Sequence, residues 1–234
     1  MEEENKFAGY CPATLKFLKS LEKNNNKQWF EKHKNDYKNF VLEPTRSLVN
    51  ELGDFMLDID PRFEIAPSIN KTISRMYRDT RFSKDKTPYR SNFWIVFKRQ
   101  KKEWSTQGCA YFFEVYKDWY HFGMGFYDAA PAIMSKFREQ IDENPEEFLK
   151  AISFYSKQKT FELKGENYKR IIDNSKPKEI QDWYQKKSMY LVCERKIDKA
   201  LFSRKLVSDL KKGFDMLGPV YRYLQKTISL AMTT

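Results

Sequence analysis

The middle of the chain carries three closely spaced runs of aromatic and β-branched residues, and this block limits the possible folds most narrowly. Residues 92–97, 109–116 and 119–127 are rich in Phe, Tyr, Trp, Ile and Val, the residue types that favour strands. Lys117 and Asp118 leave only a tight connection between the second and third runs. The three runs therefore predict an antiparallel meander.

Helical periodicity flanks this block on both sides. Upstream, apolar residues recur at helical spacing over 14–21, 29–41 and 48–56, with an Asn run at 24–26 as a cap and Pro44 at a helix boundary. Downstream, we expect helices that begin at Pro131, Pro145 and Pro177, loops over 160–176, a strand at 189–193, and two terminal helices at 201–214 and 219–230. Helices, then strands, then helices predict an α+β fold: an antiparallel sheet flanked by N-terminal and C-terminal helices.

Composition places the chain among well-packed globular proteins. Its 234 residues are 41% apolar and 16% aromatic, which excludes a disordered chain, because disordered chains lack the apolar area that offsets ordering entropy. The mean hydropathy of −0.77, without a long apolar run, predicts no membrane-spanning helix and no membrane partner. We expect a single domain over residues 1–234.

Cysteine usage and the N-terminus bear on the compartment. Cys11, Cys109 and Cys193 are odd in number and form no CxxC pair, so neither a disulfide framework nor a zinc ribbon is indicated. The acidic Met1–Asn5 start has no apolar region of the kind found in secretory signals. These features predict a cytoplasmic, reducing location.

The positive charge is concentrated in one segment. The chain has a net charge of +11, and residues 71–102, with 11 basic and 2 acidic side chains, contribute +9 of it. A local excess of one sign points to an anionic partner better than a high pI spread over the whole surface.

Within this segment, a set of arginines and lysines forms a candidate anion-binding site. Arginine presents a planar fork of donors that matches carboxylate and phosphate oxygens. The candidate residues are Arg75, Arg78, Arg81, Lys84, Lys86 and Tyr89, with Asp79 and Asp85 as carboxylates that orient the arginines. Nearby positive charge should lower the pKa of both aspartates, which makes them weak bases but suitable ligands for Mg²⁺, the only cofactor indicated.

The same segment carries a resemblance to a known family. The string Arg78-Asp79-Thr80-Arg81-Phe82-Ser83-Lys84-Asp85-Lys86-Thr87-Pro88-Tyr89 resembles the hallmark of the DUF2461 family, as do Asn25-Asn26 with Trp29-Phe30 upstream and Gly123-Met124-Gly125 and Phe137-Arg138 downstream. The resemblance covers nearly the whole chain and implies a compact α+β fold, but it brings no established activity and no catalytic residues. Around residues 168–180 the chain lacks a glycine that members often carry after a Lys-Arg pair.

The sequence gives weaker evidence for other kinds of functional site. The two histidines, His33 and His121, are too few for a multi-histidine metal site. We expect His33 to lie on a helix surface, and His121, which shares a strand face with two glycines, to border a cleft. Trp29 is a second candidate for a cleft border. Because Trp29 and Phe30 are adjacent, their rings should point to different sides of a helix, so that at least one lies in the core and the other can cover the arginines. Gly123 and Gly125 indicate close strand packing rather than a dinucleotide fingerprint.

Three functions therefore remain open. The first is a binding site, with or without catalysis, for a small phosphorylated ligand or another oxyanion. The second is a module that binds nucleic acid or another polyanion, which the dilute charge of residues 103–234 makes less favoured. The third is a non-catalytic structural or interaction protein in which the arginines and aspartates form a salt-bridge network. The sequence does not indicate an oligomeric state.

Overall fold

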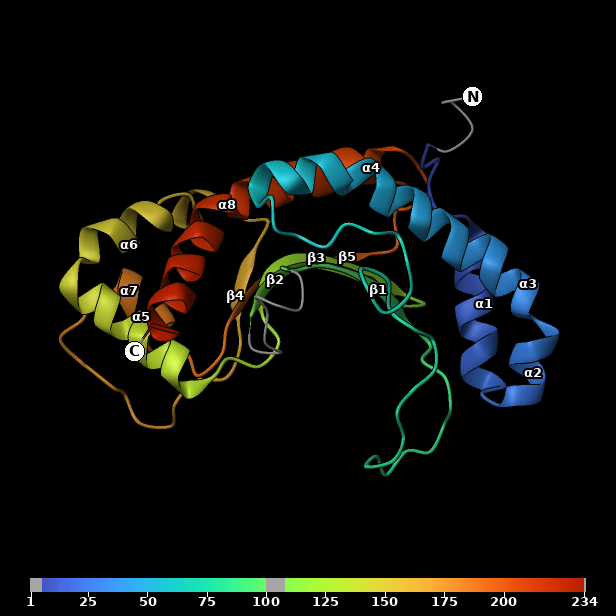
Figure 1. The fold of residues 1–234 in the computed structure, drawn as a ribbon, viewed down its shortest axis with the longest axis horizontal. Coiled ribbons are helices and arrows are strands. Elements are labelled where there is room, and N and C mark those ends of the chain that lie inside the picture. The colour runs from blue at the N-terminus through green and yellow to red at the C-terminus, as the bar shows by residue number, and fades with distance from the viewer. Residues whose placement is uncertain (1–5, 100–107, 234) are drawn as a thin grey trace. The chain divides into compact units, whose positions relative to one another are not determined.

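The computed structural model describes residues 6–99 and 108–233. Within these residues, helices precede and follow five strands that form one antiparallel sheet in the order β1-β2-β3-β5-β4 (Figure 1). The strands are β1 (Phe93–Phe97), β2 (Cys109–Val115), β3 (Trp119–Phe126), β4 (Glu162–Lys164) and β5 (Tyr190–Lys196). The predicted α+β fold is thus confirmed, with β1, β2 and β3 adjacent as expected for the meander.

The N-terminal helices follow the apolar periodicity, but the helix expected over 29–41 is divided into shorter pieces. They are α1 (Pro12–Lys23), α2 (Lys27–Lys32), α3 (Lys34–Tyr37), a π-helical turn (Lys38–Leu42) and α4 (Glu43–Ile59). Asn26 caps α2, because its side chain accepts a hydrogen bond from the backbone N–H of Trp29. Pro44 lies in the first turn of α4, where its missing N–H costs no helical bond.

The strands explain where the core lies. Side chains alternate across β1 and β2, and one face carries buried rings such as Phe93 and Phe113. Tyr10 packs against both rings, at centroid distances of 5.3 and 6.3 Å, and its hydroxyl bonds to Thr45 of α4 at 3.1 Å. The opposite face, called here the second face, carries half-buried residues that include Trp94, Phe112, Glu114, Trp119 and His121.

The described residues group into two compact units. The first holds residues 6–97, 112–122 and 194–212, and the second holds residues 98–99, 108–111, 123–193 and 213–233. The second unit contains α5 (Pro131–Glu143), α6 (Pro145–Ala151), a 3-10 turn (Tyr155–Lys157) and α7 (Lys178–Tyr184). Strands β2, β3 and β5 and the last helix contribute residues to both units. The expectation of a single domain stays a prediction.

The last helix corrects one prediction. Helix α8 runs without a break from Lys205 to Ala231, with Pro219 inside it, so the two terminal helices predicted there are one. A proline inside a helix costs about 3 kcal/mol, whereas one large apolar side chain contributes about 1.5–3 kcal/mol when fully buried. Leu217, Val220, Tyr221 and Leu224 are all buried on either side of the proline, and their burial outweighs its cost.

Strand β4 lies where only loops were expected. Its three residues pair antiparallel with β5, Glu162 with Val192 and Lys164 with Tyr190. A strand this short has no alternation that a sequence pattern can show, so only the neighbouring strand identifies it.

Two segments with sequence-based predictions are not covered. The five polar residues 98–102 predict a turn, and residues 100–102 of it lie outside the described residues, as does the acidic start at 1–5. Among the described residues, no helix combines the length and the apolar character that crossing a membrane requires.

Candidate functional site

The candidate residues lie on a long loop, residues 75–90, which we call the basic loop. Its two arms run antiparallel: Arg78 N–H donates to the Pro88 carbonyl at 2.8 Å, and Arg90 N–H donates to the Met76 carbonyl at 2.8 Å. A further bridge joins Ile73 to Ile95, along the outer edge of β1. Figure 1 shows this loop, in teal to green, projecting from β1 as a narrow arm.

The base of the basic loop is fixed by a second part of the sequence. The Asn25 side chain donates to the Tyr89 carbonyl at 2.8 Å and accepts from the Tyr89 N–H at 2.9 Å, as a neighbouring strand would. The Phe30 ring stacks on the Tyr89 ring at 4.1 Å and 11°. Two blocks that resemble one family in sequence, 64 residues apart, therefore meet at Tyr89. Tyr89 is buried here and does not lie among the cations at the tip.

One arginine–aspartate pair orders the first half of the tip. Asp79 accepts from the backbone N–H of Arg81 at 3.2 Å, and from its Nε at 3.0 Å and Nη2 at 2.7 Å. The hydrogen bonds from the guanidinium and then from this backbone amide lower the pKa of Asp79 to about 2.

A second pair orders the other half. Arg78 Nη1 donates to Asp85 and to the hydroxyl of Thr87, while Asp85 accepts from the Thr87 N–H at 2.9 Å. The Thr87 amide, followed by Arg78, lowers the pKa of Asp85 to about 2. Lys86 donates across the tip to the Thr80 carbonyl at 2.9 Å. The pKa of both aspartates is thus lowered, as expected, and each carboxylate pairs with an arginine.

The remaining cations extend outward. Arg75 and Lys84 are exposed and make no side-chain hydrogen bond or ion pair with the described residues. Arg75 nevertheless lies close enough to lower the pKa of Asp79 by its charge. Phe82 is 95% exposed at the tip, and the Arg81 guanidinium lies 5.8 Å from its ring centroid. The tip therefore presents cations and an exposed ring to solvent.

Trp29 does not stack on the arginines. Its ring stacks on His33 at 4.0 Å and lies 5.8 Å from Phe17, whereas the neighbouring Phe30 stacks on Tyr89 at the base of the basic loop. The reason is the helix: adjacent residues point to different sides, and Phe30 is the one directed to the loop. His33, half-buried, bonds through Nδ1 to the Trp29 carbonyl at 2.8 Å.

His121 lies on the second face, where Glu114 holds it. The His121 Nε2 is 2.7 Å from the Glu114 carboxylate, and both side chains are largely buried. Glu114 was not among the predicted residues, although the sequence contains a signal for it. A tight turn at Lys117-Asp118 sets residue 114 opposite residue 121 on the same face.

The described residues contain no group of three or more His, Cys, Asp or Glu side chains able to hold a metal ion. Asp79 and Asp85, the candidate Mg²⁺ ligands, each contact an arginine instead.

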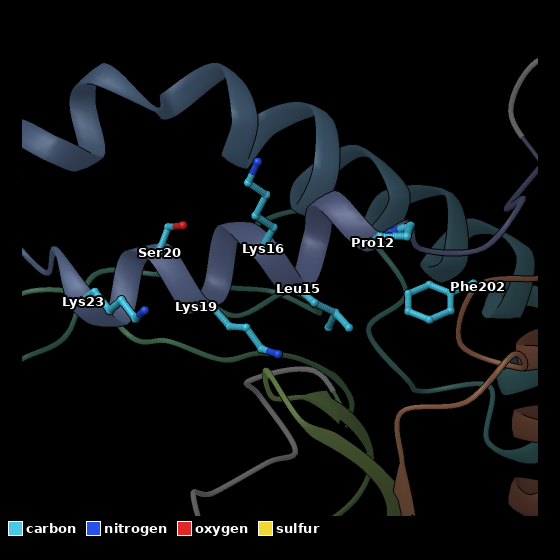
Figure 2. Close-up of a pocket in the computed structure, with 7 residues that line it drawn as sticks. All are labelled: Pro12, Leu15, Lys16, Lys19, Ser20, Lys23 and Phe202. Atoms are coloured by element: carbon cyan, nitrogen blue, oxygen red, sulfur yellow. The ribbon is translucent and has the colours of Figure 1, made fainter.

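A surface groove on the first unit lies along α1 (Figure 2). It has a volume of about 440 Å³, with Leu15 and Phe202 at one end and Lys23 at the other. One of its lysines, Lys19, pairs with Asp118 at 3.2 Å. None of the predicted site residues lines this groove.

The segment where the chain departs from the family pattern lies in the second unit. Gln185 fastens it by donating to the carbonyls of Tyr168 at 2.8 Å and Arg170 at 2.7 Å. Ile171 and Ile172 are exposed there.

The comparison with known families agrees with the motif. The family described as "Conserved hypothetical protein (DUF2461)" matches residues 13–223 of the chain. No curated protein matches the chain.

Proposed function

Since the chain belongs to the DUF2461 family, whose description states no activity, we propose its function from its own geometry: the basic loop binds a phosphorylated ligand. Residues 75–90 carry six cationic side chains and two carboxylates, so the loop has a net charge of +4. The proposed contacts are Arg75, Arg78, Arg81, Lys84 and Lys86.

The observation that carries the proposal is the exposure of the carboxylate in each arginine–aspartate pair. Asp79 and Asp85 have side chains that are 40% and 57% exposed. Ion pairs with a solvent-exposed carboxylate contribute little to stability, so a phosphate can replace the carboxylate at small cost. A phosphate also offers more charge and more acceptor oxygens than one carboxylate does. The aspartates thus orient the guanidinium groups and still leave them able to bind a phosphate.

Binding, rather than proton transfer, is the role this loop can perform. With a pKa near 2, both aspartates remain ionised at neutral pH and are poor bases. The hydrogen bonds among Asp79, Arg81, Asp85 and Thr87 order the tip before a ligand arrives. A pre-ordered site loses less conformational entropy on binding.

A thermal-shift titration with inorganic phosphate, adenosine monophosphate and a hexose phosphate tests the proposal. Saturable stabilisation is expected, reaching about 2.7 kcal/mol at a ligand concentration 100 times Kd, or roughly 5–10 °C in Tm. The variant Arg75→Ala/Lys84→Ala should lose most of this shift and keep its own Tm, because neither side chain bonds within the described structure. Arg170→Ala, which removes an exposed charge elsewhere, should keep the shift.

Arg78→Ala adds a second measurement. It should abolish the shift, and circular dichroism checks that the variant folds. If no phosphorylated compound stabilises the wild type, the arginine–aspartate pairs serve the structure alone, and the proposal is wrong.

A second candidate, binding of single-stranded nucleic acid, rests on a different observation. Phe82 is 95% and Tyr77 57% exposed among the cations, and exposed rings of this kind stack on bases. Oligonucleotide affinity should then fall steeply with salt, since each phosphate contact releases a counterion. Phe82→Ala should weaken oligonucleotide binding and leave the response to inorganic phosphate unchanged.

We also propose a cytoplasmic location. The three cysteines are odd in number and form no CxxC pair in the sequence, which suits a reducing compartment. Expression with a compartment-specific reporter tests this directly.

A further inference from the structure

A row of polar side chains crosses three strands on the second face, apart from the basic loop. Asn92 precedes β1, Glu114 lies in β2 and His121 lies in β3. The Asn92 amide donates to Glu114 Oε1, and the His121 Nε2 lies 2.7 Å from Glu114 Oε2. The two carboxylate oxygens therefore face different partners.

This arrangement assigns the proton on the histidine. An ionised carboxylate only accepts hydrogen bonds, so Nε2 carries the hydrogen that points to Glu114. In the neutral imidazole the remaining nitrogen, Nδ1, then holds the lone pair. Nδ1 has no hydrogen-bond partner in the part of the chain that the structure describes.

Tyr116 lies beside this arrangement. Burial, and then the charge of the Glu114 carboxylate, raises the pKa of its hydroxyl well above the ordinary value. The hydroxyl therefore stays protonated. Two donors, from Asn92 and His121, converge on the Glu114 carboxylate, which holds the imidazole in one orientation.

Aromatic rings surround the histidine. The centroids of Trp119, Phe112 and Tyr116 lie 4.9, 5.2 and 5.9 Å from that of His121, all at steep angles to its ring. Trp119 and Tyr116 stack on each other at 4.1 Å. The three rings are half-buried, and the His121 side chain is 15% exposed, so solvent reaches this spot.

We propose that His121 Nδ1 is the acceptor of a hydrogen bond, and of a proton, from a small hydroxyl-bearing aromatic ligand that binds on the second face. The three rings around His121 would make edge and face contacts with an aromatic ligand. His121 Nδ1 would accept a hydrogen bond from an O–H group on that ligand. In the proton transfer, the ligand O–H bond breaks and an Nδ1–H bond forms. The ligand keeps the electron pair as an oxyanion, and the imidazolium is stabilised by Glu114.

Two-dimensional ¹H–¹⁵N spectra test the proton assignment, and the chain offers an internal comparison. His33 Nδ1 bonds to a carbonyl, so His33 should be the Nδ1–H form, whereas His121 should be the Nε2–H form. A His121 found with its hydrogen on Nδ1 overturns the proposal.

Titration with phenol, and with anisole as the matched compound without O–H, tests the ligand class. Phenol should shift the His121 Nδ1 and Trp119 indole signals saturably, and anisole should not. Glu114→Gln should weaken phenol binding roughly tenfold. His121→Gln should abolish the Trp119 shift, and His33→Gln should change nothing. Equal shifts with both compounds, or none with phenol in the folded wild type, would show that no such site exists.

Discussion

Asn25 shows how one side chain links distant parts of this sequence. Its amide satisfies both the N–H and the C=O of Tyr89, at 2.9 and 2.8 Å. Without this amide, two backbone groups at the half-buried base of the basic loop would lose their partners. Leaving a buried polar group unsatisfied costs about 1–3 kcal/mol.

We therefore predict that Asn25→Leu lowers the free energy of unfolding by about 2–4 kcal/mol, measured by urea denaturation. Trypsin should also cleave the basic loop of this variant faster, since its base is no longer fixed. Asn35→Leu, at an exposed position whose side chain makes no bond to another described residue, is the control and should change neither measurement. Unchanged proteolysis of Asn25→Leu would show that Phe30 alone holds the loop.

The two tip aspartates differ in what lowers their pKa. For Asp79 the largest cause is the Arg81 side chain, and for Asp85 it is the backbone amide of Thr87. Because both pKa values are lowered to about 2 in the folded protein, the pairs stabilise it above the ordinary carboxyl pKa. That stability is lost as the pH falls through about 4 toward 2.

Carboxyl ¹³C titration by NMR should give a midpoint near 2 for both groups. In Arg81→Gln the midpoint of Asp79 should rise most of the way to its ordinary value of about 3.9. In Arg78→Gln the midpoint of Asp85 should rise less, because the Thr87 amide remains. Wild-type midpoints near 4 for both groups would contradict the paired geometry.

At the scale of strands and helices, close backbone contacts decide which glycines matter. In β3, a Cβ on Gly125 would lie 2.4 Å from the Tyr190 Cα and 2.6 Å from the Met189 carbonyl oxygen. Backbone atoms cannot move aside cheaply, so this glycine sets the spacing between β3 and β5. The sequence-based interpretation of close strand packing at Gly125 is confirmed.

Gly125→Ala should therefore destabilise the protein by at least 2–3 kcal/mol, as overpacking does. Gly53→Ala is the matched control: it lies within α4, and its nearest neighbour would be the Ile65 side chain at 3.5 Å. That change should stabilise by up to about 1 kcal/mol, because alanine favours helix more than glycine does. Chemical denaturation of both variants checks the opposite signs.

At the scale of the whole molecule, the net charge of +11 is unevenly distributed along the chain. The basic loop has six cationic and two acidic side chains and so contributes +4, and each of its aspartates pairs with an arginine. This distribution is compatible with a local anion site and less so with a surface that binds nucleic acid everywhere.

The division into two compact units raises the question of how many unfolding transitions the protein has. Since β2, β3, β5 and α8 contribute residues to both, one unit cannot lose these elements without affecting the other. We predict a single calorimetric transition with equal calorimetric and van't Hoff enthalpies. For 234 residues the enthalpy should be on the order of 160 kcal/mol near 60 °C. Two resolved transitions would instead indicate two domains.

Local patterns in the sequence determined the type and place of most elements. The aromatic runs became β1, β2 and β3, and the apolar periodicity with its Asn and Pro boundaries placed α1, α2, α4 and α5. These signals are local, because propensity, capping and side-chain alternation depend on residues a few positions apart.

Only the tertiary structure decided the contacts that define the candidate sites. Asn25 and Tyr89 are 64 residues apart, Pro219 remains helical because of buried neighbours, and β4 exists because β5 lies beside it. The pairing of Arg81 with Asp79 and of Arg78 with Asp85 likewise depends on the path of the basic loop. Such contacts form between residues whose distance along the chain is unrelated to their distance in space, so no periodicity in the sequence records them.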